Sequence, residues 1–296
     1  MKILLFGHDG QVGTELRRSL ALVGEVVAPP LAGGALCGDL CDAEGIRATL
    51  ESVRPDVIVN AAGHTAVDRA EDEPDAAMRV NADGPALLAR LAGRHGAWLV
   101  HYSTDYVYDG TGTRPWKEDD AAAPLSVYGA SKLAGDAAVA GHARHLILRT
   151  SWVYAAHGEN FARTILRLGR ERSELKIIDD QVGAPTPADL LANATAHMLH
   201  AALREPALAG LYNVAPAGET SWHGYAVELL RLARARGLPV RVAESAVLPI
   251  PSSAYSVRAR RPHNSRLDTT RFRRTFGLTL PDWREPLARF IETLQQ

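Results

Sequence analysis

Apolar and polar residues alternate in blocks along the first 150 residues, and this pattern predicts strands separated by helices. Short, nearly all-apolar runs are expected to form strands at residues 2–6, 25–28, 56–61, 97–103 and 145–150. Between them, apolar positions take helical spacing, as at Ile46, Leu50 and Val53, which fall at i, i+4 and i+7. Such alternation is typical of α/β proteins with a doubly wound parallel sheet that helices cover on both faces.

The pattern becomes less regular after Thr150. Helices are expected at residues 159–172, 187–204, 222–236, 268–277 and 281–295, and a strand at 211–214. Asp268 is a good N-cap for the fourth of these helices, which Gly277 would end. Residues 246–262 are rich in Pro, Ser and Arg, and helical spacing resumes after them, which favours an irregular binding loop over a linker.

Composition and charge narrow the possible partners. The formal net charge is −1, from 33 basic and 34 acidic residues, so nothing favours a nucleic acid or an anionic membrane. No apolar stretch is long enough to span a bilayer, and no signal-peptide pattern follows Met1. Cys37 and Cys41 have C-x3-C rather than C-x-x-C spacing, so we expect two reduced thiols and a cytoplasmic location.

Glycines follow the first predicted strand and lead into a predicted helix. Gly7, Gly10 and Gly13 allow a tight turn and a close approach to a diphosphate, which the amides of the helix would attract. The second predicted strand ends in Ala28-Pro29-Pro30, without the carboxylate that would bind the ribose of NAD. The choice between NADH and NADPH therefore stays open. Asp39 either faces the adenine or caps a helix beside Asp42.

Tyr128 and Lys132 form a Tyr-x3-Lys pair, on one face of a predicted helix. A nearby ammonium would lower the high pKa of a tyrosine and let it donate a proton to a carbonyl oxygen. Ser103, Thr104 and Asp105 end a predicted strand, where ligands of open α/β sheets bind. Taken alone, the Tyr-x3-Lys pair is equally consistent with an exposed helix pair. The three signals together favour a reductase site.

Other polar clusters are less specific. The basic run at residues 258–264 offers Arg261 and Asn264 as contacts for a nucleotide-sugar diphosphate, although a solvated loop would have the same composition. Trp152 would stack on a sugar or base, or belong to the core. His197 and His200 lie three residues apart without a third ligand, so they predict no catalytic metal.

At these residues the chain resembles the extended short-chain dehydrogenase/reductase superfamily and, within it, the dTDP-4-dehydrorhamnose reductases, over essentially its whole length. No single motif is specific, but the set is. The matching stretches are Gly7-x-x-Gly10-Gln11-Val12-Gly13, Asn60-Ala61-Ala62-Gly63-His64-Thr65-Ala66-Val67-Asp68, His101-Tyr102-Ser103-Thr104-Asp105-Tyr106-Val107, Tyr128-Gly129-x-x-Lys132-Leu133-Ala134-Gly135, Arg149-Thr150-Ser151-Trp152-Val153-Tyr154 and Ala259-Arg260-Arg261-Pro262-x-Asn264-Ser265.

The resemblance implies a Rossmann domain at residues 1–151 and a smaller C-terminal α/β substrate-binding region at 152–296, with elements that can interleave. It implies that NADPH or NADH reduces dTDP-4-dehydro-β-L-rhamnose to dTDP-β-L-rhamnose, a sugar donor for surface polysaccharides. Tyr128 would be the proton donor, Lys132 the cofactor-binding partner, and Thr104 the residue that orients the reacting oxygen. Thr104, Asp105 and Trp152 would contact the sugar nucleotide. Cofactor contacts would come from Gly7, Gly10, Gln11, Val12, Gly13, Asp39, Leu40, Ala62, Gly63, His64 and Thr65.

Some members of this family form a dimer around a magnesium ion held by carboxylates. The nearest matches here are Glu15, Asp189 and Glu292, so a homodimer with a structural Mg²⁺ is a further expectation. Two alternatives differ in class. Nucleotide-sugar dehydratases or epimerases share the fold, but dehydratases carry a glutamate where Tyr106 follows Asp105. The regulatory subunit of methionine adenosyltransferase resembles the family and acts by binding a partner.

Overall fold

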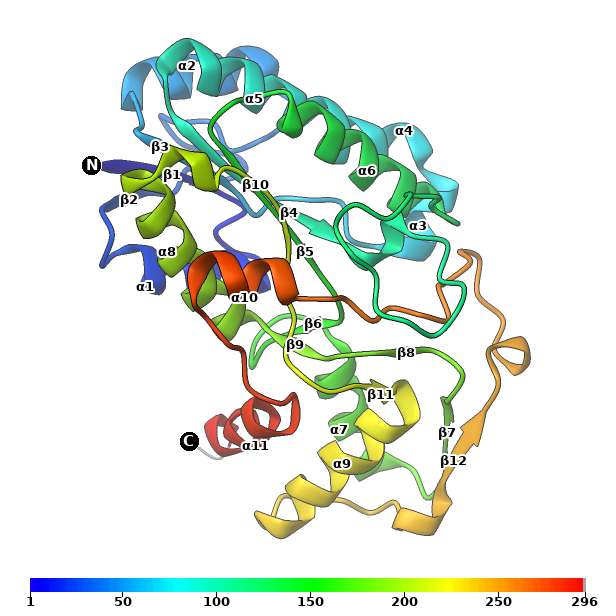
Figure 1. Cartoon of the computed structure of the whole chain (residues 1–296). Helices are drawn as coiled ribbons and strands as arrows, with labels where there is room; N and C mark the ends of the chain where they lie inside the picture. The colour runs from blue at the N-terminus through cyan, green and yellow to red at the C-terminus, as the bar shows by residue number, and fades with distance from the viewer. Residues whose placement is uncertain (295–296) are drawn as a thin grey trace.

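A computed structural model describes residues 1–294, and its centre is a six-stranded parallel sheet (Figure 1). Its strands run in the order β10-β5-β4-β3-β1-β2, and every neighbouring pair is parallel. The order changes direction between β1 and β3, which opens a crevice at the carboxyl ends of these two strands. The strands are β1 (Lys2–Phe6), β2 (Glu25–Val27), β3 (Val57–Asn60), β4 (Trp98–Thr104), β5 (His145–Thr150) and β10 (Gly210–Asn213).

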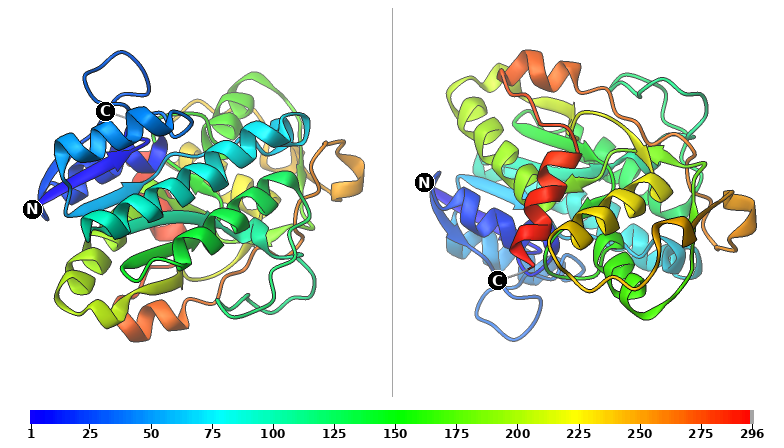
Figure 2. Two further views of the ribbon diagram at one scale, coloured as in Figure 1. Left: turned by 90° about the horizontal axis from the view of Figure 1, so that it is seen from above. Right: turned by 90° about the horizontal axis from the view of Figure 1, so that it is seen from below.

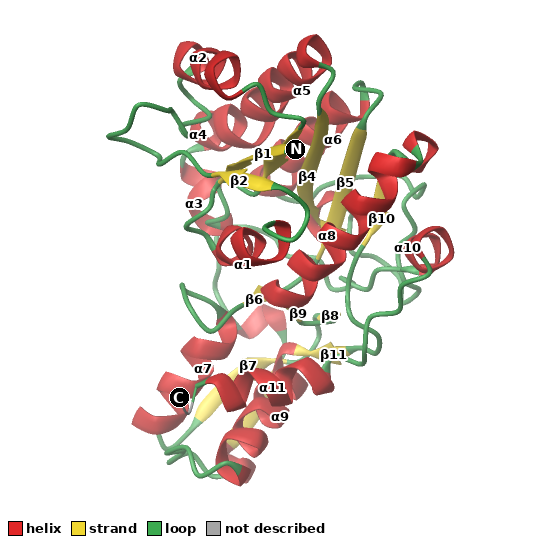
Figure 3. Ribbon diagram, turned by 90° about the vertical axis from the view of Figure 1, so that its left-hand side faces the viewer, coloured by secondary structure: helices red, strands yellow, loops and turns green. Residues whose placement is uncertain are grey.

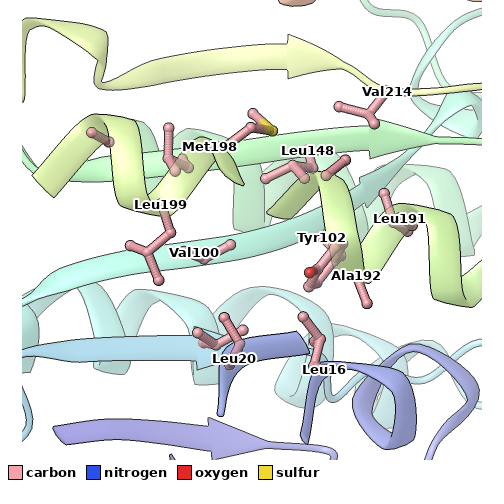
Figure 4. Close-up of a cluster of buried hydrophobic side chains, with 14 of the residues drawn as sticks. Leu16, Leu20, Val100, Tyr102, Leu148, Leu191, Ala192, Met198, Leu199 and Val214 are labelled. Carbon is pink, nitrogen blue, oxygen red and sulfur yellow. The ribbon is translucent and has the colours of Figure 1, made fainter. Parts of the chain in front are cut away.

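Helices cover both faces of this sheet, because its strands are apolar on both faces (Figure 2). One face packs against α1 (Gln11–Leu20), α8 (Ala188–Arg204) and α10 (Thr270–Phe276). Figure 4 shows buried side chains of this layer, among them Leu16 and Leu20 of α1 and Val100 of β4. The other face packs against α2 (Ala43–Val53), α5 (Gly84–His95) and α6 (Val127–Ala140).

A second cluster of elements lies beyond the carboxyl ends of the strands (Figure 3). Its own core includes Tyr225 and Leu229 and is separate from the two layers around the large sheet. Its strands form two-stranded sheets only, pairing β11 with β8, β12 with β7 and β6 with β9. The elements are β6 (Val153–Tyr154), α7 (Phe161–Glu171), β7 (Leu175–Ile178), β8 (Val182–Gly183), β9 (Thr186–Pro187), β11 (Thr220–Ser221), α9 (Trp222–Ala235), β12 (Val247–Ile250) and α11 (Arg284–Thr293).

The doubly wound α/β architecture predicted from the sequence is confirmed. The division near residue 151 stays a prediction, and α8, β10 and α10 join the larger unit from the second half of the chain. One prediction was wrong, because residues 247–250 of the expected irregular loop form β12. Another was one residue off: Thr269 is the N-cap of α10, while the Asp268 carboxylate accepts a hydrogen bond from the amide two residues on, that of Thr270. Residue 295 of the last predicted helix lies outside the described residues.

Sequence patterning missed a run of short helices between β3 and α5. They are α3 (Val67–Asp72), α4 (Pro74–Met78) and a π-helical turn at Arg79–Asp83. π-Helical turns are rare and are found often at functional sites. Within the described residues, no helix is both long and apolar enough to cross a membrane.

Candidate active site

A cavity of about 350 Å³ lies at the carboxyl ends of β1 and β3, where the strand order changes. The turn after β1 is so tight that only glycine fits. A Cβ at Gly13 would lie 1.9 Å from the carbonyl oxygen of Gly7, and one at Gly7, whose φ is +73°, would lie 2.5 Å from the amide nitrogen of Ala62. This packing brings the N-terminus of α1 close to the cavity, which is the arrangement that binds a dinucleotide diphosphate.

Seven of the residues predicted to contact a cofactor line this cavity: Gly7, Gly10, Asp39, Leu40, Ala62, Gly63 and His64. Four others, Gln11, Val12, Gly13 and Thr65, are not among its lining residues. The Gln11 side chain instead donates a hydrogen bond to the carbonyl of Glu159 and accepts one from Asn160 at 2.8 Å. Val12 packs against the core, and Gly13 supports the turn.

Asp39 has a different role from its neighbour Asp42. The Asp42 carboxylate caps α2 by accepting a hydrogen bond from Gly45 N at 3.0 Å, so the alternative reading of Asp39 as the cap is wrong. Asp39 lines the cavity and accepts a hydrogen bond from Cys41 N at 2.9 Å.

Cys37 and Cys41 are both free thiols. No lysine or arginine is among the residues that line this cavity.

Tyr128, Lys132 and Thr104 meet at the carboxyl end of β4. Thr104 ends this strand and hydrogen-bonds the phenol of Tyr128. Ser126 begins α6 by accepting a hydrogen bond from Gly129 N at 3.1 Å, which places Tyr128 in the first helical turn. The Lys132 ammonium is buried and donates to the carbonyl oxygen of Tyr102.

The charges at this site differ from the expectation that an ammonium would lower the pKa of Tyr128. Burial raises the pKa of Tyr128, the carboxylates of Asp105 and Asp136 raise it further, and only the hydrogen bond with Thr104 lowers it. Burial also lowers the pKa of Lys132 to about 8, against the opposing charge of Asp136. The phenol is therefore protonated at neutral pH.

Asp105 is the next residue after Thr104 and is 1% exposed. Its Oδ1 atom accepts a hydrogen bond from the Thr104 hydroxyl at 3.1 Å, while Oδ2 has no partner among the described residues. Burial raises the pKa of this carboxyl to about 7, although the hydroxyls of Ser265 and Thr104 nearby lower it. A buried, unpaired acceptor beside the catalytic candidates is able to bind a ligand hydroxyl.

A larger cavity of about 720 Å³ lies in the second cluster of elements. Its lining combines aromatic rings with cationic side chains, which suits a nucleotide diphosphate. The aromatic residues are Phe161, Trp222 and Tyr255, and the cationic ones are Arg172, Lys176 and Arg261.

Comparison with known proteins agrees with this geometry. The family model described as RmlD substrate binding domain matches residues 1–296. The dTDP-4-dehydrorhamnose reductase of Escherichia coli (strain K12) is 51% identical over 295 residues, covering 99% of this chain and 98% of the relative. The chain belongs to the dTDP-4-dehydrorhamnose reductase family.

Solved structures of this family have the same fold over the full length. A dTDP-4-dehydrorhamnose reductase from Clostridium acetobutylicum is 34% identical with a TM-score of 0.89, and the match covers 100% of both chains. One from Bacillus anthracis, solved in complex with NADP, is 32% identical with a TM-score of 0.87, and the match covers 99% of both chains.

Three predicted contact residues of this family member have partners within the chain. Trp152 stacks on Trp222 at 3.7 Å between ring centroids, and Trp222, not Trp152, lines the larger cavity. Arg261 also lines that cavity and pairs with Asp68 at 2.6 Å. Asn264 is buried and donates to the carbonyls of Thr111 and Arg114, which indicates a structural role.

The predicted magnesium ligands do not come together within one chain. Glu15 and Asp189 line a third cavity, of about 460 Å³, together with Arg289. Glu292 is not among its lining residues and pairs with Arg236. Among the described residues, no group of three or more His, Cys, Asp or Glu side chains could hold a metal ion. Within one subunit the three carboxylates do not form a metal site. The magnesium ion expected at a dimer interface stays a prediction.

Sequence reasoning missed the polar residues that lie behind the catalytic candidates. Asn81, in the π-helical turn, accepts a hydrogen bond from His64 N at 2.9 Å and donates to Ser131 Oγ at 3.0 Å. It thereby connects the smaller cavity to α6. Asp136 lies one helical turn after Lys132, and this i+4 spacing was the available signal.

Proposed function

We propose that this protein reduces the C4 keto group of dTDP-4-dehydro-β-L-rhamnose to the hydroxyl of dTDP-β-L-rhamnose, with NADPH or NADH as the reductant. One observation carries the proposal: Thr104, Tyr128 and Lys132 meet at the end of β4, in the same sheet as the glycine turn. The identity to reductases of this name supplies the substrate.

A nicotinamide dinucleotide fits the smaller cavity by the chemistry of its lining. The glycine turn leaves no room for a Cβ at Gly7 or Gly13, and the amides at the start of α1 would hold the diphosphate. Asp39 and Leu40 would lie along the adenosine. When bound, the cofactor supplies a hydride to the sugar carbon. Since no cationic side chain lines the cavity, we expect no strong selection of NADPH through a 2′-phosphate.

Tyr128 would donate the proton that completes the reduction. Its raised pKa keeps the phenol protonated at neutral pH, so the proton is in place before the substrate binds. As the carbonyl carbon becomes tetrahedral, its oxygen takes this proton and becomes the C4 hydroxyl. Thr104 would orient the same oxygen, and Lys132 would hold the nicotinamide ribose and stabilise the phenolate that remains.

The larger cavity would hold the nucleotide part of the substrate. Trp222 and Phe161 offer apolar rings for the thymine, while Arg261 would bind the diphosphate in place of Asp68. Asp105 would accept a hydrogen bond from a sugar hydroxyl through its unpaired oxygen. A homodimer, a cytoplasmic location and a substrate-binding region after residue 151 belong to the same proposal.

Turnover with product identification tests this function. The substrate is generated in place by the enzymes that precede this step, loss of NADPH or NADH absorbance is followed, and the product is identified by NMR. We expect dTDP-L-rhamnose, with Tyr128→Phe slower by about 10²–10⁴-fold because the proton donor is lost. Folded wild-type protein without turnover on either cofactor would contradict the proposal and favour the partner-binding alternative.

A further inference from the structure

Helix α6 carries three ionisable side chains on one face, at i, i+4 and i+8: Tyr128, Lys132 and Asp136. The proposed reaction uses the first two. Asp136 is 3% exposed, and nothing in the proposed chemistry yet accounts for a carboxylate at this depth. A buried charge is costly unless it is paired, so its partners indicate its role.

The Asp136 carboxylate ties α6 to two strands of the sheet. Its Oδ2 atom accepts hydrogen bonds from Ser103 Oγ of β4 at 2.8 Å and from Arg149 Nε of β5 at 3.1 Å. Ser103 immediately precedes Thr104. The same carboxylate therefore fixes the position of the catalytic helix relative to the strand that carries the reacting-oxygen contact.

Without Asp136, the buried positive charges of Lys132 and Arg149 would not be offset by a carboxylate on α6. Lys132 and Arg149 are both buried cations. Burial and the charge of Lys132 hold the pKa of His101 well below its ordinary value, so this histidine is neutral. The π-helical turn presents Asn81, which is uncharged, and the nearby tyrosines are neutral. The ionisable side chains whose charge acts on Lys132, or on which Lys132 acts, are Asp136 on α6 and His101 on β4; Tyr102 offers Lys132 only its backbone carbonyl, and Arg149 of β5 acts on Asp136.

We propose that Asp136 is a positioning residue of the reaction, which anchors α6 to β4 and β5 and supplies the negative charge that keeps Lys132 an ammonium. The proposal rests on the proposed function, in which Lys132 acts as a cation. Arg149 also binds the Asp136 carboxylate, through Nε, and its Nη1 atom donates a hydrogen bond to the Tyr108 hydroxyl at 2.8 Å. Lys132 donates one of its three N–H groups to the Tyr102 carbonyl, a neutral group. Among the described residues, Asp136 is the carboxylate whose charge raises the pKa of Lys132.

The pH dependence of Asp136→Asn tests this role. The substitution keeps the shape and removes the charge, so the pKa of Lys132 should fall below that of the wild type, which is about 8. We expect the alkaline limb of the kcat/KM profile to move to lower pH by about 1 unit or more. The loss of activity should therefore be deeper at pH 9 than at pH 6, and NADPH affinity, measured by fluorescence, should weaken with the same pH dependence.

Three variants serve as matched comparisons. Asp136→Glu retains the carboxylate and should restore the alkaline limb. Asp120→Asn removes a carboxylate that pairs with Arg114 at the surface, and its profile should match the wild type. Arg149→Met removes the cation that competes for Asp136, so the limb should move to higher pH. A loss of packing would not move the alkaline limb in opposite directions in the Asp136→Asn and Arg149→Met variants.

The outcomes separate this inference from the proposed function. Folded Asp136→Asn with lower activity at every pH and an unshifted limb would reduce Asp136 to a structural residue. If Asp136→Asn does not fold, an unshifted limb in Arg149→Met overturns the proposal instead. Wild-type protein that binds NADPH but turns over no substrate would contradict the function, while the pH dependence of NADPH binding would still test Asp136.

Discussion

The two cavities proposed to hold the cofactor and the sugar nucleotide are built in different ways. The smaller one is shaped by backbone: glycines bring β1, the following turn and α1 together so closely that a single Cβ would collide. The larger one is shaped by side chains from α7, β7, β12, the start of α9 and the segment near residue 261. A backbone-built site tolerates little change but needs few specific residues, whereas a side-chain-built site depends on several segments far apart in the sequence.

The largest effect on stability and cofactor binding is expected in the glycine turn after β1, where two backbone segments are in direct contact. Gly13→Ala would place its Cβ 1.9 Å from the Gly7 carbonyl oxygen, so we expect a loss of about 3 kcal/mol of stability and no detectable NADPH binding. At Gly10 the nearest atom to a Cβ is 3.4 Å away, so Gly10→Ala should stay within about 0.5 kcal/mol of the wild type. Denaturant unfolding and NADPH titration measure both. Equal stability of the two variants would break the comparison.

An intermediate effect is expected from a substitution in the larger cavity. It should weaken substrate binding and leave NADPH binding in the smaller cavity unchanged. Arg261→Ala removes the charged contact proposed for the diphosphate, so KM for the sugar nucleotide should rise by about 10–100-fold. The Kd of NADPH should remain that of the wild type, because Arg261 does not line the smaller cavity. Steady-state kinetics and fluorescence titration distinguish the two. A parallel loss of NADPH affinity would mean that the cavities do not act independently.

The smallest effect concerns stability at Asp105, beside Thr104. Its carboxyl has a pKa of about 7 in the folded protein, above the ordinary value of about 3.9. The folded state therefore binds the extra proton, and Asp105 makes the protein progressively less stable as pH rises from about 4 to 7. Asp105→Asn lacks this cost and should melt a few degrees higher than the wild type at pH 8, with the difference vanishing near pH 4. Its activity should fall. A constant difference across this range would refute the assignment.

The contrast between the cavities also explains what sequence could predict. The alternation of apolar runs and helical spacing specified the parallel sheet, and the glycines after β1 indicated a dinucleotide turn, because both signals are local. The role of Trp222 in the larger cavity and the strand β12 were not predicted from the sequence. Both depend on contacts between segments more than 60 residues apart: Trp222 stacks on Trp152, and β12 pairs with β7. The pKa of Tyr128 was expected to be lowered because helical spacing places Lys132 near it, whereas burial, which no spacing reveals, dominates.

The approach of α6 to the π-helical turn has a consequence for protein engineering. A Cβ at Gly135 would lie 2.2 Å from the carbonyl oxygen of Asn81, and Gly135 lies between Lys132 and Asp136 in the sequence. Residues 81 and 135 therefore have to fit each other. A chimera of two relatives with its junction between these positions would take the two sides of this contact from different proteins, so the contact could be lost. Junctions placed before the turn or after α6 would keep this contact intact, so they are the better boundaries for recombining reductases of this fold.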